Sequence, residues 1–149
     1  MAFSAFYFIL PLIVGITLPF QPVINARVSE VLGHPLWGTA VNFTVGFVFV
    51  MALMLAARIP LPALGAVASV PWWGWLGGFI GAFLVTVSLW CVPKIGVALT
   101  MALLIAGQML ASILLDHFKV LPNTDHPLTM LRLMGAAFIV VGVILILKF

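Results

Sequence analysis

Residues 95–115 read IGVALTMALLIAGQMLASILL, a run with no charged side chain. An α-helix rises about 1.5 Å per residue, so a helix of this length crosses the roughly 30 Å of hydrocarbon in a bilayer. Four further apolar runs of similar length surround it, at residues 4–26, 36–57, 72–92 and 129–147. We therefore predict an all-α membrane protein whose five transmembrane helices form a single domain, 1–149.

The composition of the chain excludes a soluble domain. Hydrophobic residues make up 65% of the 149 residues and charged residues only 6%, and the mean hydropathy is +1.36, all far from the values of soluble proteins. The first run has no basic leader, so we expect it to remain as a helix and not to be a cleaved signal. The net charge of +3 favours membrane lipid headgroups over nucleic acid as a partner.

Residues suited to covalent or metal chemistry are scarce. The single cysteine, Cys91, cannot form an internal disulfide and lacks the companion ligands of a metal site. The sequence has no nucleophile with its base, no metal cluster and no phosphate-binding loop, so we predict that the chain is not an enzyme and uses no metal or cofactor.

The positive residues are divided equally between the two sides of the membrane. Five spans put the termini on opposite sides, here called side A for the amino terminus and side B for the carboxy terminus. The positive-inside rule needs an excess on one side to choose an orientation. Side A holds Arg58, Lys119 and Arg132, and side B holds Arg27, Lys94 and Lys148. The balance predicts insertion in both orientations, unless Arg132, a turn inside its helix, counts less and leaves a weak preference.

A chain that inserts both ways can pair with an inverted copy of itself. Two such subunits reproduce the inverted-topology repeat that many transporters carry in one polypeptide. We therefore predict an antiparallel homodimer, with a related subunit of opposite orientation as the alternative partner.

The first apolar run carries two amides beside two prolines. Gln21 and Asn25 are four residues apart and share a helix face, while Pro19 and Pro22 lack backbone donors and predict a local break. Polar groups in a membrane face protein or water, so this break marks a candidate functional interior. The carbonyls freed there either bind water, ions or solute, or are satisfied by neighbouring helices; the sequence leaves both interpretations open.

Other polar residues fall at a similar depth. In the up-and-down order of the spans, the B-side half of the membrane holds Gln21, Asn42, Thr86, Ser88 and Thr100. This agreement predicts one polar half-chamber in each subunit. Hydroxyl side chains can also bond the backbone of their own helix, which is the alternative role for the threonines and the serine.

The run 95–115 adds a polar stripe, because Thr100, Gln108, Ser112 and Asp116 are spaced by multiples of four. Gln108 lies nearest the middle of the membrane and is predicted either to contact a solute or to hold a neighbouring helix. Asp116 lies at a helix carboxyl end, where the helix dipole disfavours an anion, so we expect a cationic partner. The candidates are Lys119, His117 and Arg132, in an interfacial ion pair or, alternatively, in a proton relay.

No acidic or basic residue lies near the centre of the first four spans. A charge there costs roughly 2.5–3.5 kcal/mol on the insertion scale, a cost that proteins bear when coupling requires it. We therefore expect a solute site made of amides, hydroxyls, aromatic faces and carbonyls. Such a site suits neutral, zwitterionic or hydrophobic organic molecules, and aromatic faces can also bind organic cations.

Several of these residues recur in the order and spacing of a known family. They are Gly15, Pro19, Gln21, Asn25, Ala26 and Arg27; Gly33, Pro35 and the Phe43 to Gly46 spacing; Pro93, Lys94 and Gly96; Gly107 and Gln108; Asp116, His117 and Phe118; and Arg132 to Gly135. In these the chain resembles the YdcZ-like five-helix family of the drug/metabolite transporter superfamily. The resemblance implies a small prokaryotic inner-membrane protein, in dual-topology, paired or fused form, that transports small metabolites or drugs.

We predict a secondary transporter of a small organic solute that works by alternating access in an inverted dimer. The predicted solute contacts are Gln21, Asn25, Asn42, Thr86, Gln108 and Ser112. Two other functions remain open: a small dual-topology channel, and a non-transporting subunit that stabilises another membrane protein.

Overall fold

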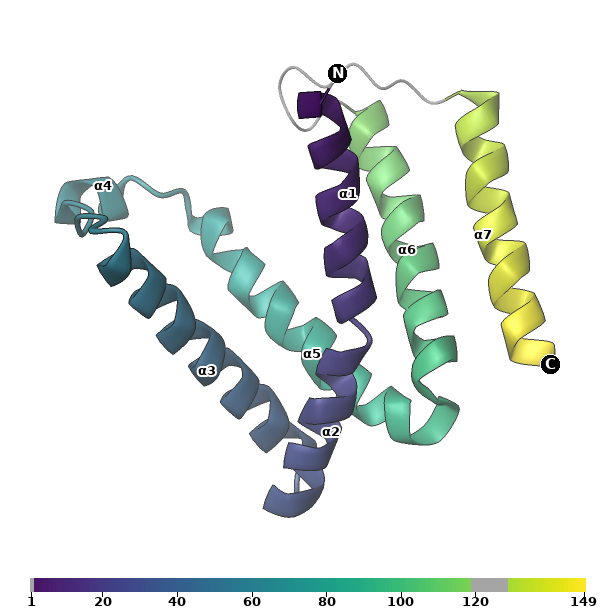
Figure 1. Cartoon of the computed structure of the whole chain (residues 1–149), viewed down its shortest axis with the longest axis horizontal. Helices are drawn as coiled ribbons and strands as arrows, with labels where there is room; N and C mark the ends of the chain where they lie inside the picture. The colour runs from purple at the N-terminus through teal and green to yellow at the C-terminus, as the bar shows by residue number, and fades with distance from the viewer. Residues whose placement is uncertain (1, 119–128) are drawn as a thin grey trace. The chain divides into compact units, whose positions relative to one another are not determined.

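The computed structural model describes residues 2–118 and 129–149, without the side chains of residues 2–6 and 8, and these residues fold as helices and turns (Figure 1). Five segments are long and apolar enough to span a membrane: Ile9–Leu32, Pro35–Ala56, Trp72–Ile95, Val97–His117 and Met130–Lys148. The helices are α1 (Ala2–Thr17), α2 (Phe20–Leu32), α3 (Pro35–Ala56), α4 (Leu64–Ala68), the 3-10 helix η1 (Trp72–Trp75), α5 (Leu76–Ile95), α6 (Val97–His117) and α7 (Met130–Lys148). The predicted all-α fold with five spans is confirmed.

Two compact units divide the chain, Met1–Lys94 and Ile95–Phe149. The first contains α1 to α5, and the second contains α6 and α7.

The first span is interrupted by a turn at Leu18 and Pro19, between α1 and α2 (Figure 1). In a continuous helix the amides of residues 19 and 22 would donate to the carbonyls of Gly15 and Leu18, but both residues are prolines and have no N–H. The Leu18 carbonyl instead accepts from the amide of Gln21 at 3.3 Å. The helix break expected from the two prolines is therefore present.

The first and third spans extend furthest beyond their predicted ends. The first was expected to stop at residue 26, before Arg27, but α2 continues to Leu32 and includes an exposed ion pair of 2.6 Å between Arg27 and Glu30. It ends at Gly33, whose φ of 80° places the backbone in the left-handed region that favours glycine. The third span was expected to stop at residue 92, but α5 includes Pro93 and continues to Ile95.

Helices α2, α3 and α5 pack closely around Gly38 of α3. A methyl group at this position would overlap Ser29 Oγ on α2, lie 2.7 Å from the carbonyl oxygen of Asn25, and lie 3.1 Å from Leu89 Cδ1 on α5. Leu89 is only 2% exposed, and Ser29 Oγ donates to the Asn25 carbonyl at 2.8 Å. The missing side chain of Gly38 therefore allows α2 to approach α3.

In the second unit α6 packs against α7. Thr129 caps α7, because its hydroxyl accepts a hydrogen bond from the amide of Arg132 at 3.3 Å. The buried apolar residues of this unit include Ile113 on α6 and Ala136 and Val143 on α7.

We predict that Gly38→Ala destabilises the folded protein by about 1–3 kcal/mol, the usual cost of overpacking. The control is Gly46→Ala on the same helix, where an added methyl group meets nothing within 4 Å. Thermal unfolding of both variants in detergent checks this. A Gly38→Ala melting temperature equal to that of Gly46→Ala would show that the close approach at Gly38 has no energetic weight.

Candidate functional site

Three amide side chains meet between α2 and α3. Gln21 Nε2 donates to Asn42 Oδ1 at 2.9 Å, and Asn25 Nδ2 donates to the same oxygen at 3.1 Å. The two donors lie on one face of α2, as their spacing of four residues predicts. We call Gln21, Asn25 and Asn42 the amide cluster.

The amide cluster uses only part of its hydrogen-bonding capacity. Asn42 Oδ1 accepts two bonds, which occupy both of its lone pairs. Within the described residues, the amino group of Asn42 and the carbonyl oxygens of the Gln21 and Asn25 side chains have no hydrogen-bond partner. None of these atoms is fully buried. Asn25 is 6% exposed, whereas Gln21 is exposed, so the cluster extends from the helix interface to its surface.

A pair of hydroxyl groups lies close to the amide cluster along α3. Thr39 Oγ1 and Thr86 Oγ1 are 3.0 Å apart, and Thr86 Oγ1 also donates to the carbonyl of Ala82 at 2.8 Å. Thr39 Oγ1 also lies 3.5 Å from the carbonyl oxygen of Pro35, so either hydroxyl can be the donor in the pair. Thr39 is not among the predicted site residues, although its position three residues before Asn42 places both on one face of α3.

The other predicted hydroxyl groups bond the backbones of their own helices. Ser88 Oγ donates to the Leu84 carbonyl at 2.8 Å, Thr100 Oγ1 to Gly96 at 2.7 Å, and Ser112 Oγ to Gln108 at 2.6 Å. This is the local alternative that the sequence left open. A role for Ser112 in solute binding stays a prediction.

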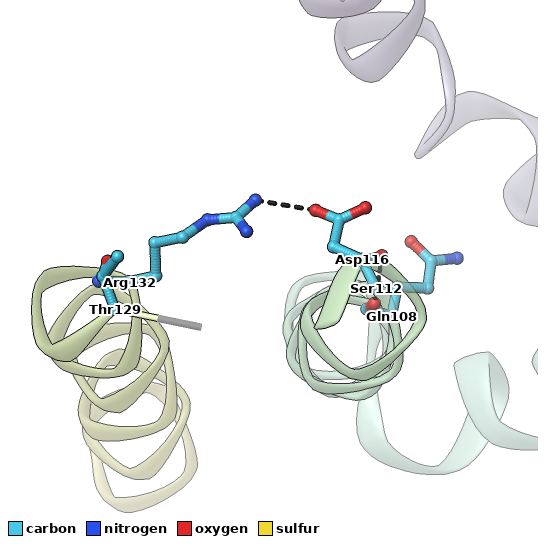
Figure 2. A network of polar contacts seen from close by, with 5 residues as sticks. All are labelled: Gln108, Ser112, Asp116, Thr129 and Arg132. Atoms are coloured by element: carbon cyan, nitrogen blue, oxygen red, sulfur yellow. Dashed lines mark hydrogen bonds and ion pairs between the residues drawn. The ribbon is translucent and has the colours of Figure 1, made fainter. Parts of the chain in front are cut away.

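An ion pair joins α6 to α7 in the second unit. Arg132 Nη2 lies 2.7 Å from Asp116 Oδ2, and the side chains are 36% and 31% exposed, respectively (Figure 2). Among the expected partners of Asp116, Lys119 lies outside the described residues. The ring of His117 packs edge-on against Phe118, with 5.3 Å between centroids. Asp116 thus has the arginine partner that its place at a helix carboxyl end requires.

Gln108 lies away from this ion pair. An α-helix turns about 100° per residue, so each step of four residues drifts by about 40° around the axis. Two such steps separate Gln108 from Asp116, and Figure 2 shows the Gln108 amide on the side of α6 away from Arg132. The residues of the predicted polar stripe therefore face different sides of α6. Asp116 is the member of the stripe that has a described ion pair with α7.

The predicted site residues thus form two groups. Gln21, Asn25, Asn42 and Thr86 lie together in the first unit, whereas Gln108, Ser112, Asp116 and Arg132 lie in the second. Within the described residues, no group of three or more His, Cys, Asp or Glu side chains is arranged to hold a metal ion.

The profile of a protein family described as "Putative inner membrane exporter, YdcZ" matches residues 6–145. The chain belongs to this YdcZ family. It is also similar to the inner membrane protein YdcZ of Escherichia coli strain K12, with 29% identity over 136 residues that cover 90% of this chain and 89% of the relative. No solved structure matches it. The chain is therefore a multi-pass inner-membrane protein, and its family is described as one of exporters and not of enzymes.

We predict that Asp116 and Arg132 stabilise the packing of α6 on α7 cooperatively. A double-mutant cycle with Asp116→Asn and Arg132→Gln should give a coupling free energy of unfolding of about 0.5–3 kcal/mol. The matched control is the Arg27–Glu30 pair, whose side chains are 72% and 69% exposed, with a coupling of at most about 1 kcal/mol. Equal coupling free energies in the two cycles would show that the Asp116–Arg132 pair stabilises the fold no more than an exposed surface pair does.

Proposed function

We propose that this member of the YdcZ family is a secondary transporter that exports a small organic solute by alternating access. Its working unit is a pair of subunits inserted in opposite orientations. The family description supports export across the inner membrane, and the observation that carries the inverted pair is the equal division of the positive residues between the two sides.

The two described ion pairs preserve this division. Arg27 on side B pairs with Glu30, and Arg132 on side A pairs with Asp116. Leaving out both arginines therefore removes one positive residue from each side. What remains is Arg58 and Lys119 on side A, and Lys94 and Lys148 on side B. The orientation signal is balanced whether or not paired arginines are counted.

The amide cluster supports a solute site in the first unit. Its hydrogen-bonding groups lie beside the interruption between α1 and α2, where the chain departs from helical geometry. Helices interrupted inside the membrane supply the binding sites of many transporters. Gln21 is exposed in the single chain, so an inverted partner that covers it would close a chamber that one subunit leaves open.

A carrier differs from a channel and from a non-transporting subunit in its kinetics. Solutes that stabilise the purified protein against heat, as bound ligands do, are loaded as labelled compounds into liposomes containing only this protein. We expect saturable efflux and an acceleration of label exit by unlabelled solute on the other side. Efflux that rises linearly with concentration would establish a channel, and no movement of any such solute would establish a non-transporting subunit.

Orientation is tested by adding two lysines directly after Met1. This change should hold side A in the cytoplasm, because an excess of positive residues now decides the orientation. Accessibility of a cysteine added at the carboxy terminus of a Cys91→Ser chain reports the orientation in cells. We expect two populations in the starting chain, one in the lysine variant, and loss of exchange activity in the variant.

Co-expression with a chain carrying two lysines after Phe149, which favours the opposite orientation, should restore that activity. Full exchange by either biased chain alone would refute the inverted pair. A single population in the starting chain would refute dual insertion.

A further inference from the structure

We propose that the amide cluster binds an uncharged solute that carries both a hydrogen-bond donor and an acceptor, as a carboxamide does. This inference names the solute class for the proposed function and rests on it for transport, although binding can be measured separately. It follows from the hydrogen bonds that Gln21, Asn25 and Asn42 make and from those that they leave unmade.

The three amides of the cluster make some of their possible hydrogen bonds and leave others unmade. Asn42 Oδ1 accepts from both Gln21 and Asn25, while the Asn42 amino group and the carbonyl oxygens of the Gln21 and Asn25 side chains have no hydrogen-bond partner among the described residues. The cluster therefore offers donors and acceptors side by side. A solute with only one kind of group would leave the other kind unpaired when water is displaced, which weakens binding.

Among the described residues, the cluster has no hydrogen-bonded counter-charge. The charged residues nearest the cluster in sequence are Arg27 and Glu30, which pair with each other at 2.6 Å and are exposed. No hydrogen bond joins a charged side chain to the cluster within the described residues. An ion transferred from water to a site without a counter-charge loses its hydration free energy, and no ion pair at the site replaces it. An uncharged solute avoids this loss.

Amides between membrane helices can hold the helices together as well as bind a solute. The two roles use different atoms of Asn42. Its carbonyl oxygen ties α2 to α3 through Gln21 and Asn25, while its amino group makes no bond with any described residue. Asn42→Asp retains an oxygen that accepts both bonds, but replaces the amino group with a second acceptor that carries negative charge.

The experiment uses the full-length chain in nanodiscs and two sets of probes matched in shape. Each set contains a neutral amide, its acid anion and its amidinium cation: acetamide, acetate and acetamidinium, and benzamide, benzoate and benzamidinium. The concentration dependence of the melting temperature gives the affinity for each probe. We expect at least one amide to bind the unchanged protein about tenfold more tightly than both ions of its set.

In Asn42→Asp we expect affinity for that amide to fall about tenfold and the matching amidinium to become the preferred probe. The matched control is Thr44→Asp, which adds the same carboxylate two residues along α3 at an exposed position outside the cluster. It should keep the preference for the amide.

Three results would overturn the inference: no amide binding by the unchanged protein, ions that bind as tightly as their amides, or the same switch to amidinium in Thr44→Asp as in Asn42→Asp. The first two need no variant, so a folding defect of Asn42→Asp cannot hide them. Amide binding without saturable exchange in liposomes would instead reject the carrier and leave the amide site in place.

Discussion

Hydrocarbon offers no hydrogen-bond partner, so each polar group of the five spans must bond another group of the protein or meet a second molecule. The hydroxyls of Ser88, Thr100 and Ser112 meet this condition within their own helices. The amide cluster meets it between helices, and only in part. This difference distinguishes hydroxyl groups that are bonded within their own helices from amides that keep unpaired hydrogen-bonding groups among the described residues.

The interruption of the first span and the amide cluster are physically connected. Pro19 and Pro22 remove two backbone donors, and a turn at Leu18 and Pro19 separates α2 from α1. Gly38 then allows α2 to approach α3, which brings Gln21 and Asn25 within reach of Asn42. Small residues permit close helix contacts in membranes, where no hydrophobic force drives helices together. The candidate site thus depends on three residues that have almost no polar chemistry of their own.

Charge has two separate functions in this chain. At the ends of the spans the positive residues influence orientation, and their even division persists when the Arg27–Glu30 and Arg132–Asp116 pairs are set aside. Within the second unit the Arg132–Asp116 pair joins α6 to α7 at a helix carboxyl end, where an isolated aspartate would be unfavourable. Neither the orientation signal nor the contact between α6 and α7 needs a charge at the amide cluster, in agreement with the proposed binding of uncharged solutes there.

The sequence by itself determined the five spans, the interrupted first span and the shared face of Gln21 and Asn25, because span length, proline chemistry and helical periodicity are local properties. Local rules also predicted that Asp116 needs a cation, but they could not choose Arg132 from three candidates. Only the tertiary structure showed that Arg132 pairs with Asp116, that both amides donate to one oxygen of Asn42, and that the Thr39 hydroxyl lies beside that of Thr86. Each depends on which helix faces pack together, and apolar residues all around a membrane helix leave that choice without a sequence signal.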